Sequence, residues 1–157
     1  MAKSTRATQA LERAGVGFSL PAYEVDRAEP TYGESVAAAL GVDPDRVFKT
    51  LVAIVDGAPV VGIVPVSGHL SLKKLARAAG GKHATMADPA DAERLTGYVV
   101  GGISPLGQRR RLSTYVDETA TIHGTVFVSA GQRGLQVELA PEHLLTVVGG
   151  RAVDLAD

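Results

Sequence analysis

One lysine stands in a strongly apolar segment, where an ammonium group could do chemistry. Lys49 lies in Val47-Phe48-Lys49-Thr50-Leu51, at the start of a predicted strand. If its side chain faces solvent, it is an ordinary surface lysine. If it faces a cleft, the ammonium could hold a phosphate or stabilise an oxyanion. Thr50 would point to the opposite face of an ideal strand, although its backbone could line the same site.

A glycine-rich segment, Gly101–Gln108, could form the facing wall of such a site. Glycine has no side chain, so a ligand can approach the backbone amides closely, as a bound ester carbonyl or a terminal adenosine would require. The alternative is a plain connection between elements. Gly101-Gly102 matches neither the dinucleotide-binding fingerprint nor the P-loop, which disfavours nucleotide binding of those types.

Two tyrosines, Tyr23 and Tyr32, flank the first predicted loop region. The chain has four tyrosines, three phenylalanines and no tryptophan, so each aromatic side chain is a notable feature. A tyrosine at the mouth of a pocket could stack on a base, or it could simply pack in the core. Both interpretations stay open for this pair.

Several hydrolytic mechanisms are excluded or disfavoured by the residues present. The chain has no cysteine, which excludes a structural disulfide, a thiolate nucleophile and a cysteine-based zinc site. None of the four histidines pairs with another at i, i+4, so a zinc hydrolase is disfavoured. There is no Gly-x-Ser-x-Gly elbow. Ser104 and Ser129 lack a base nearby in the sequence, although a triad partner could be distant.

Composition and charge indicate a globular protein without a general affinity for nucleic acid. The 157 residues, 45% apolar and 21% charged, predict one compact domain over residues 1–157. The formal net charge of −1 argues against a strong non-specific nucleic-acid binder but allows a local basic surface. Basic residues gather in two places: Lys73, Lys74, Arg77 and Lys82, and the run Arg109-Arg110-Arg111. No signal-peptide or membrane-length apolar run is present, so we expect a cytoplasmic protein that does not enter a membrane.

The predicted elements are short strands mixed with short helices. Helices are expected over 5–14 (capped by Ser4), 33–40, 72–79, 89–95 and 141–147, with one short turn after Asp43-Pro44. Strands are expected over 18–25, 47–55, 59–66, 83–86, 98–100, 112–116, 125–129 and 135–139, and a strand or tail over 152–155. Asp56-Gly57 predicts a hairpin turn. This order predicts an α+β domain with a largely antiparallel sheet.

Three segments taken together resemble the YbaK/EbsC family of editing proteins. They are Val47–Leu51, Gly97–Gln108 and Ser129–Leu139, of which the middle one is the most specific. Their order and spacing agree with the family over nearly the whole chain. The resemblance implies the fold of the YbaK/prolyl-tRNA-synthetase-associated domain, a twisted, mixed and mostly antiparallel sheet or partial barrel surrounded by short helices.

The resemblance also implies an activity, deacylation of Cys-tRNA(Pro) in trans. The site of a tRNA synthetase that selects the amino acid discriminates weakly between small side chains. A second site is therefore needed to hydrolyse the mischarged tRNA. The implied mechanism is assisted by the substrate: the thiol of the bound cysteine attacks its own ester carbonyl and expels the tRNA 3′ end. It implies no metal and no cofactor, with aminoacylated tRNA(Pro) and prolyl-tRNA synthetase as partners.

Site residues are implied position by position. The implied catalytic residues are Lys49, Gly101 and Ser129, and the implied substrate-binding residues are Tyr23, Tyr32, Thr50, Gly102 and Gln136. Lys49 would hold a terminal phosphate or the ester region, Gly101 would supply a backbone contact, and Ser129 would hydrogen-bond the aminoacyl end. Gln136 departs from the family pattern, since some members carry aspartate there. A neutral amide cannot pair with the substrate amino group as a charged anchor.

Two alternative functions remain open from the sequence. One is a deacylase for another small mischarged amino acid, such as alanine on tRNA(Pro). The other is a non-catalytic module that binds an aminoacyl or adenosine-like end.

Overall fold

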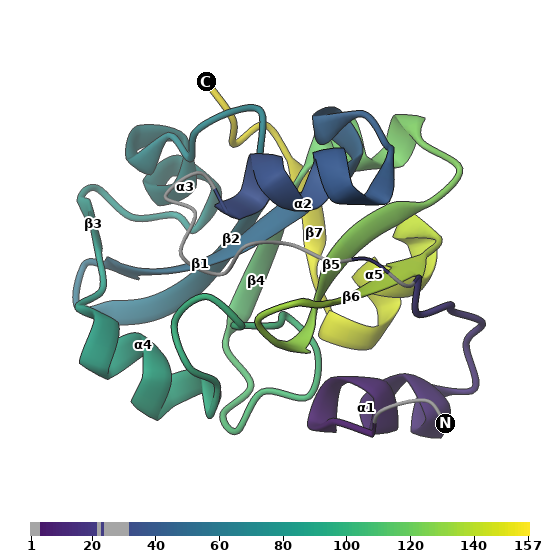
Figure 1. Cartoon of the computed structure of the whole chain (residues 1–157). Coiled ribbons are helices and arrows are strands. Elements are labelled where there is room, and N and C mark those ends of the chain that lie inside the picture. The colour runs from purple at the N-terminus through teal and green to yellow at the C-terminus, as the bar shows by residue number, and fades with distance from the viewer. Residues whose placement is uncertain (1–3, 22, 24–31) are drawn as a thin grey trace.

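The computed structural model, which describes residues 4–21, 23 and 32–157 without the side chains of residues 32–34, packs short helices around two sheets (Figure 1). The helices are α1 Arg6–Ala14, α2 Tyr32–Leu40, α3 Leu72–Ala78, α4 Pro89–Thr96 and α5 Pro141–Val148, with 3-10 helices η1 Pro44–Arg46 and η2 Glu118–Ile122. The strands are β1 Phe48–Val55, β2 Ala58–Pro65, β3 Ala84–Met86, β4 Ser113–Asp117, β5 Val126–Gln132, β6 Leu135–Leu139 and β7 Arg151–Val153. None of the helices in these described ranges has the length and apolar character needed to span a bilayer.

The larger sheet has the strand order β3-β1-β2-β4-β7, and β5 pairs with β6 in a second, two-stranded sheet. β1 pairs antiparallel with β2 and β3, and β5 with β6, whereas β4 runs parallel to both β2 and β7. A bridge between Val47 and Phe127 joins the start of β1 to β5, so the second sheet closes against the first. The α+β class and the mixed, mostly antiparallel sheet surrounded by short helices are therefore confirmed.

The β1–β2 hairpin follows directly from its sequence. Asp56 and Gly57 both have positive φ, 47° and 87°, which a two-residue hairpin turn requires and which the pair Asp-Gly favours. The turn sets the register, with Val55 opposite Ala58. The long flanking strands then run side by side through the centre of the molecule (Figure 1).

Both faces of this hairpin are buried. Val61 and Ile63 of β2 belong to one apolar cluster, which also contains residues of β5, β6, α1 and α5. Val60 and Val64 belong to a second cluster, built with α3. Because side chains alternate across a strand, continuous Val/Ile content gives β2 an apolar surface on both faces. The hairpin thus forms the wall between two cores.

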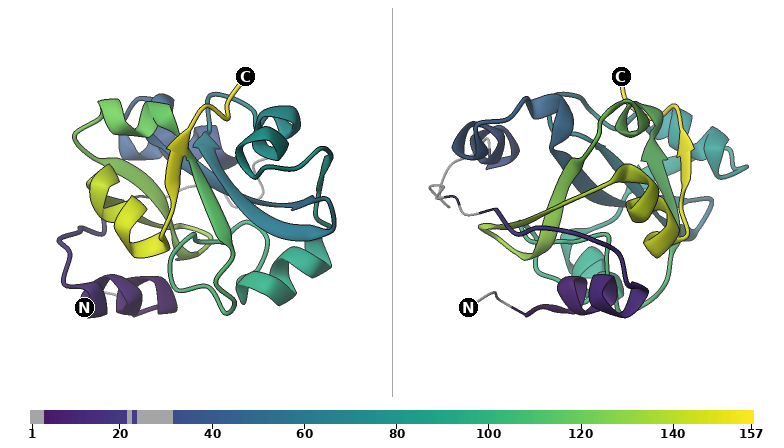
Figure 2. Two further views of the ribbon diagram at one scale, coloured as in Figure 1. Left: turned by 180° about the vertical axis from the view of Figure 1, so that it is seen from behind. Right: turned by 90° about the vertical axis from the view of Figure 1, so that its right-hand side faces the viewer.

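Helix α1 is held to the second sheet by its N-cap. The cap is Thr5, where we expected Ser4: Thr5 Oγ1 accepts a hydrogen bond from Thr8 N (3.1 Å), and Thr8 Oγ1 accepts one from Thr5 N (2.8 Å). Thr5 Oγ1 also donates to the carbonyl of Ala130 in β5 (2.6 Å). The reciprocal Thr5–Thr8 pair thus caps the helix, and the tertiary bond ties this cap to β5. Figure 2 shows α1 at the end of the molecule away from the C-terminus.

The predicted strand over Tyr98–Val100 is wrong. The backbone turns there, because Gly102 N donates to Val99 O (2.8 Å) and Val100 N donates to Glu93 Oε2 of α4 (2.8 Å). Apolar, β-branched residues favour a strand only where a neighbouring strand can pair with them.

The predicted edge strand over Phe18–Val25 shows one bridge, between Ser19 and Glu138 of β6. Residues 22 and 24–25 of that prediction lie outside the described residues.

Candidate active site

A cavity of about 310 Å³ opens between β1 and the loop that follows α4, and we call it the Lys49 cavity. Ligand pockets span roughly 300–1,000 Å³, so this one suits a small group. Its lining residues are Val36, Val47, Phe48, Lys49, Thr50, Leu51, Val52, Val66, Met86, Ala87, Pro89, Ala92, Val100, Gly101, Ile103, Ser129 and Gln136.

Five of the residues that the sequence singled out meet around this cavity. They are Lys49 and Thr50 from β1, Gly101 from the loop, Ser129 from β5 and Gln136 from β6. The cavity therefore separates the lysine from the glycine-rich wall, which is the arrangement that a lysine-and-backbone site needs. The tertiary structure gathers segments that lie more than 80 residues apart in the chain.

Two of the other three predicted residues do not line the cavity. Gly102 is not among the lining residues, and Tyr23 packs against the cluster that contains Val36 and Val47. Tyr32 begins α2, but its side chain lies outside the described residues.

Ser129 and Gln136 are cross-strand neighbours. They lie directly opposite each other in the β5–β6 register, so their side chains point to the same face of the sheet. The register shifts between Ser129 and Gln132, and Gly131 at this bulge has φ 103° and donates its N–H to Ser129 Oγ (3.2 Å). The bulge thus orients the serine hydroxyl at the edge of the cavity.

Two polar atoms of the cavity wall are buried without a hydrogen-bond partner among the described residues. They are Thr50 Oγ1 and Gln136 Oε1. Thr50 is 9% exposed and Gln136 is 5% exposed. Buried polar atoms are nearly always hydrogen-bonded, so two open ones at a single cavity point to a polar ligand that donates hydrogen bonds there.

The glycine-rich loop is a rigid wall, because its polar groups bond to one another. The Tyr98 hydroxyl donates to Leu106 O (2.5 Å), Leu106 N donates to Ser104 Oγ (3.1 Å), and the Gln108 amide donates to Ser104 O (2.9 Å). Burial raises the pKa of the Tyr98 phenol, although the nearby Arg6 guanidinium opposes this rise. The phenol therefore stays protonated and keeps its donor role at neutral pH.

The two glycines at the start of this loop allow close packing against the β5–β6 turn. Gly101 has φ 96°, and a Cβ built on it would lie 2.7 Å from a guanidinium nitrogen of Arg133. A Cβ on Gly102 would lie 2.8 Å from the backbone nitrogen of Arg133. Both glycines thus allow the loop to pack against the turn, and Gly101 also lines the cavity. Neither the type nor the spacing of Arg133 marks it as a residue of this region, and its only signal is its place in the third segment of the resemblance.

The remaining wall of the Lys49 cavity is apolar. Phe48, Val52 and Ala92 belong to the main core, and Ile103 packs against that core from the loop. Met86 and Val100 lie at the rim with 46% and 51% of their surface exposed. An apolar wall lowers the local dielectric and strengthens the hydrogen bonds and charge interactions of a bound group.

A contrasting polar centre lies at Asp117, which does not line the Lys49 cavity. Its carboxylate accepts hydrogen bonds from Leu155 N (2.9 Å), Ala156 N (2.8 Å), Thr119 N (3.2 Å) and Thr119 Oγ1 (2.5 Å). Burial by itself raises the pKa of Asp117, but these hydrogen bonds outweigh it and hold the pKa below its ordinary value. The carboxylate ties the C-terminal segment to β4 and η2.

Metal-ligating side chains do not gather around the cavity. Over residues 4–21, 23 and 32–157, no three of His, Asp and Glu come together as a set that could hold a metal ion. The polar groups available at the Lys49 cavity are an ammonium, hydroxyls, an amide and backbone groups.

Comparison with known proteins agrees with this geometry. Residues 28–147 match the model of the aminoacyl-tRNA editing domain. A protein of Enterococcus faecalis named as the Cys-tRNA(Pro)/Cys-tRNA(Cys) deacylase EbsC is 44% identical over 123 residues, which cover 78% of this chain and 75% of that protein. The chain therefore belongs to the aminoacyl-tRNA editing domain family.

Two further relatives extend the comparison. The proline–tRNA ligase of Nitratidesulfovibrio vulgaris strain DP4 is 35% identical over 100 residues, which are 61% of this chain but 17% of the ligase. The chain thus corresponds to a small part of that enzyme. A crystal structure described as a trans-editing enzyme for prolyl-tRNA synthetase superposes with a TM-score of 0.85 at 27% identity, covering 97% of this chain and 95% of the other.

Proposed function

We propose that this protein removes cysteine from mischarged Cys-tRNA(Pro), with the aminoacyl ester bound in the Lys49 cavity. The observation that carries the proposal is the pair of buried, unpartnered oxygen atoms, Thr50 Oγ1 and Gln136 Oε1, in a small cavity between Lys49 and Gly101. Membership of the editing family and the likeness to EbsC support the same substrate class.

The amino group of the substrate would donate the hydrogen bonds that Thr50 Oγ1 and Gln136 Oε1 lack. Gln136 Oε1 can accept a hydrogen bond from the amino group of the aminoacyl moiety, and Thr50 Oγ1 can accept another or donate to a carbonyl. A neutral glutamine holds that amino group by a hydrogen bond where an aspartate would add a charge. We therefore assign Gln136 to the recognition of the amino group.

Lys49 and the glycine wall act on the ester. The Lys49 ammonium holds the phosphate of the terminal nucleotide or stabilises the oxyanion that forms at the ester carbonyl. The backbone at Gly101, which lines the same cavity, lies against the same group. Ser129 hydrogen-bonds the aminoacyl end from β5.

The attacking group comes from the substrate. The cysteine sulfur attacks its own ester carbonyl carbon, a C–S bond forms and the C–O bond to the ribose breaks. The thiol proton passes to the ribose oxygen that leaves with the tRNA, and the product is a cyclic thioester. Such an intramolecular attack needs orientation more than a protein nucleophile, which fits a site without cysteine. The apolar wall keeps the bound ester away from bulk water.

A paired deacylation assay tests the proposal. The protein is incubated with Cys-tRNA(Pro), with Ser-tRNA(Pro), in which oxygen replaces the sulfur, and with Ala-tRNA(Pro). Rapid loss of the aminoacyl group from the cysteine charge alone is the expected result. Equal loss from Ala-tRNA(Pro) would contradict thiol attack and identify a broader deacylase. Loss from none of the three would identify a binding module.

A prolyl-tRNA synthetase partner and cytoplasmic action follow from this proposal. Adding the synthetase to the same assay should raise the rate at low protein concentration, because the chain's weak net charge gives it little general affinity for tRNA.

A further inference from the structure

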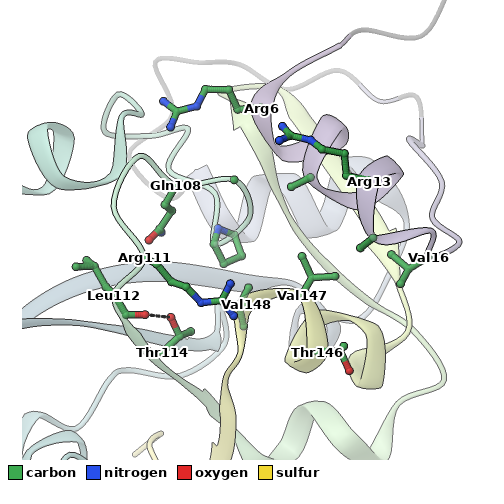
Figure 3. A pocket seen from close by; sticks show the side chains of 14 residues that line it. Arg6, Arg13, Val16, Gln108, Arg111, Leu112, Thr114, Thr146, Val147 and Val148 are labelled. Carbon is green, nitrogen blue, oxygen red and sulfur yellow. Dashed lines mark hydrogen bonds between the residues drawn. The ribbon is translucent and has the colours of Figure 1, made fainter.

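A second cavity, of about 580 Å³, is lined in part by Gly107 and Gln108 of the glycine-rich loop (Figure 3). We call it the arginine cavity, because Arg6, Arg13 and Arg111 line it and no acidic residue of the described chain does. The loop contributes Gly101 and Ile103 to the Lys49 cavity, but Gly107 and Gln108 to the arginine cavity. The same loop thus contributes residues to both cavities.

The sequence and the fold bring the three arginines to one place. Arg6 and Arg13 are seven residues apart in α1, about two helical turns, so they lie on the same face of the helix. Arg111 comes from the segment before β4, on the opposite side of the cavity in Figure 3. A run of three arginines at 109–111 thus contributes one residue to a site that the sequence alone did not assemble.

Uncharged groups pack against two of these arginines, Arg6 and Arg111. The Arg6 guanidinium lies over the Tyr98 ring, 5.8 Å from its centroid. The Arg111 guanidinium packs over Gly149, where a Cβ would overlap it. In the described part of the chain no carboxylate lies within ion-pair distance of Arg6, Arg13 or Arg111, whereas Arg46 and Arg94 each have an acidic partner.

An exposed set of arginines without acidic partners fits a ligand with several negative charges. The guanidinium group binds phosphate with two parallel hydrogen bonds, which makes arginine the preferred residue for nucleic-acid backbones. All three side chains are exposed and can reach a large ligand. The net charge of the chain is −1, so the molecule as a whole does not attract a polyanion. The local patch of arginines would do so.

We propose that the arginine cavity binds backbone phosphates of the tRNA while the aminoacyl end lies in the Lys49 cavity. This inference rests on the proposed function, since it assigns the two cavities to two parts of one substrate. The loop supports it, because one short segment, residues 101–108, contributes to both cavities and so links the two sites. Arg13 and Arg111 contact phosphates, and Arg6 also supports the loop through Tyr98.

The test compares two double variants with the same loss of charge. R13Q/R111Q removes the cavity arginines, and R77Q/R151Q removes two exposed arginines that do not line it. For each, kcat and KM are measured on Cys-tRNA(Pro) and on 3′-cysteinyl-adenosine, which lacks the backbone phosphates. The affinity for uncharged tRNA is measured as a function of salt.

We expect R13Q/R111Q to raise KM for the tRNA at least about tenfold. The slope of log binding constant against log salt concentration should become shallower by roughly 1.5, as loss of two phosphate contacts requires. Its turnover of cysteinyl-adenosine should stay within about twofold of the parent, and R77Q/R151Q should match the parent on both substrates.

Three outcomes would overturn the inference. They are an unchanged KM for R13Q/R111Q, an equal rise in both double variants, or tight binding of inorganic phosphate at the arginines without any effect on tRNA. If the parent protein cleaves neither substrate, the proposed function fails, and the binding of uncharged tRNA still decides the role of the arginines.

Discussion

The Lys49 cavity and the Asp117 centre are both places where the fold buries polar atoms, but they satisfy them differently. Asp117 receives four hydrogen bonds from its own chain. At the cavity, Thr50 Oγ1 and Gln136 Oε1 receive none from the described residues. A buried polar group with hydrogen-bond partners stabilises the fold. A buried polar group without partners lowers stability and is retained where a ligand supplies the missing hydrogen bonds.

The contrast predicts that substitutions at the two places affect different properties. Changes at Asp117 should lower stability and spare the chemistry of the folded protein. Changes at the cavity should spare stability and impair deacylation. Measurements of stability and of deacylation on variants at the two places test this division.

The largest expected effect is on stability, from D117N. An amide in place of the carboxylate loses the charge and presents its NH₂ group to donors, so the free energy of unfolding should fall by about 3 kcal/mol. Denaturant unfolding measures this, and deacylation per folded molecule should be unchanged. D154N is the matched control, since Asp154 pairs with Lys74 at the surface (3.0 Å) and its loss should cost far less.

The pH dependence of stability should follow the same carboxylate. The pKa of Asp117 is lowered in the folded state, so its contribution is present above the pKa of an unfolded aspartate, about 3.9, and is lost as the pH falls through the lower folded value. The stability of the parent should therefore drop more steeply than that of D117N on acidification below about pH 5. If the free energy of unfolding of both proteins fell equally with pH below about pH 5, this assignment would be contradicted.

At the cavity, K49A should reduce kcat/KM for Cys-tRNA(Pro) at least about tenfold, which corresponds to roughly 1.4 kcal/mol of lost transition-state stabilisation. Its unfolding midpoint should stay close to that of the parent. K73A, which removes an exposed lysine of α3, is the control and should deacylate normally. Near-normal turnover by K49A would refute the role of the ammonium.

The smallest expected change in stability comes from Q136L. Leucine has a similar size and leaves no open acceptor in the wall, so the free energy of unfolding should change by less than about 1 kcal/mol or should rise. Deacylation should fall nonetheless, mainly through KM, because the amino group loses its acceptor. A strongly destabilised Q136L would show that the amide is structural, and the contrast with Asp117 would then fail.

Local elements were the part of the fold that the sequence could predict. The Asp56-Gly57 turn, the glycine ends of α1 and α4, and the apolar β1 and β2 segments each follow from conformational preferences within a few residues. The misplaced strand at Tyr98–Val100 has the same origin, since β-branched residues signal a strand whether or not a partner strand exists. The expected cap at Ser4 is wrong for a local reason, because Thr5 and Thr8 cap the helix reciprocally three residues apart.

For the candidate site, the sequence supplied the residue types and the three segments, and the resemblance supplied their roles. It could not show that Ser129 and Gln136 are cross-strand neighbours, because the register depends on the bulge at Gly131. Nor could it distinguish Gly101, which lines the cavity, from Gly102, which does not.

The sequence by itself determined most of the helices and strands, the absence of a cysteine nucleophile and the presence of one lysine in an apolar strand. Only the tertiary structure decided that Lys49 and Gly101 line one cavity, that two buried oxygens there lack partners among the described residues, and that Arg6, Arg13 and Arg111 line another. The physical reason is that turns and caps depend on neighbours along the chain. Cavities and charge clusters depend on how separate segments pack, and that packing is a property of the whole fold.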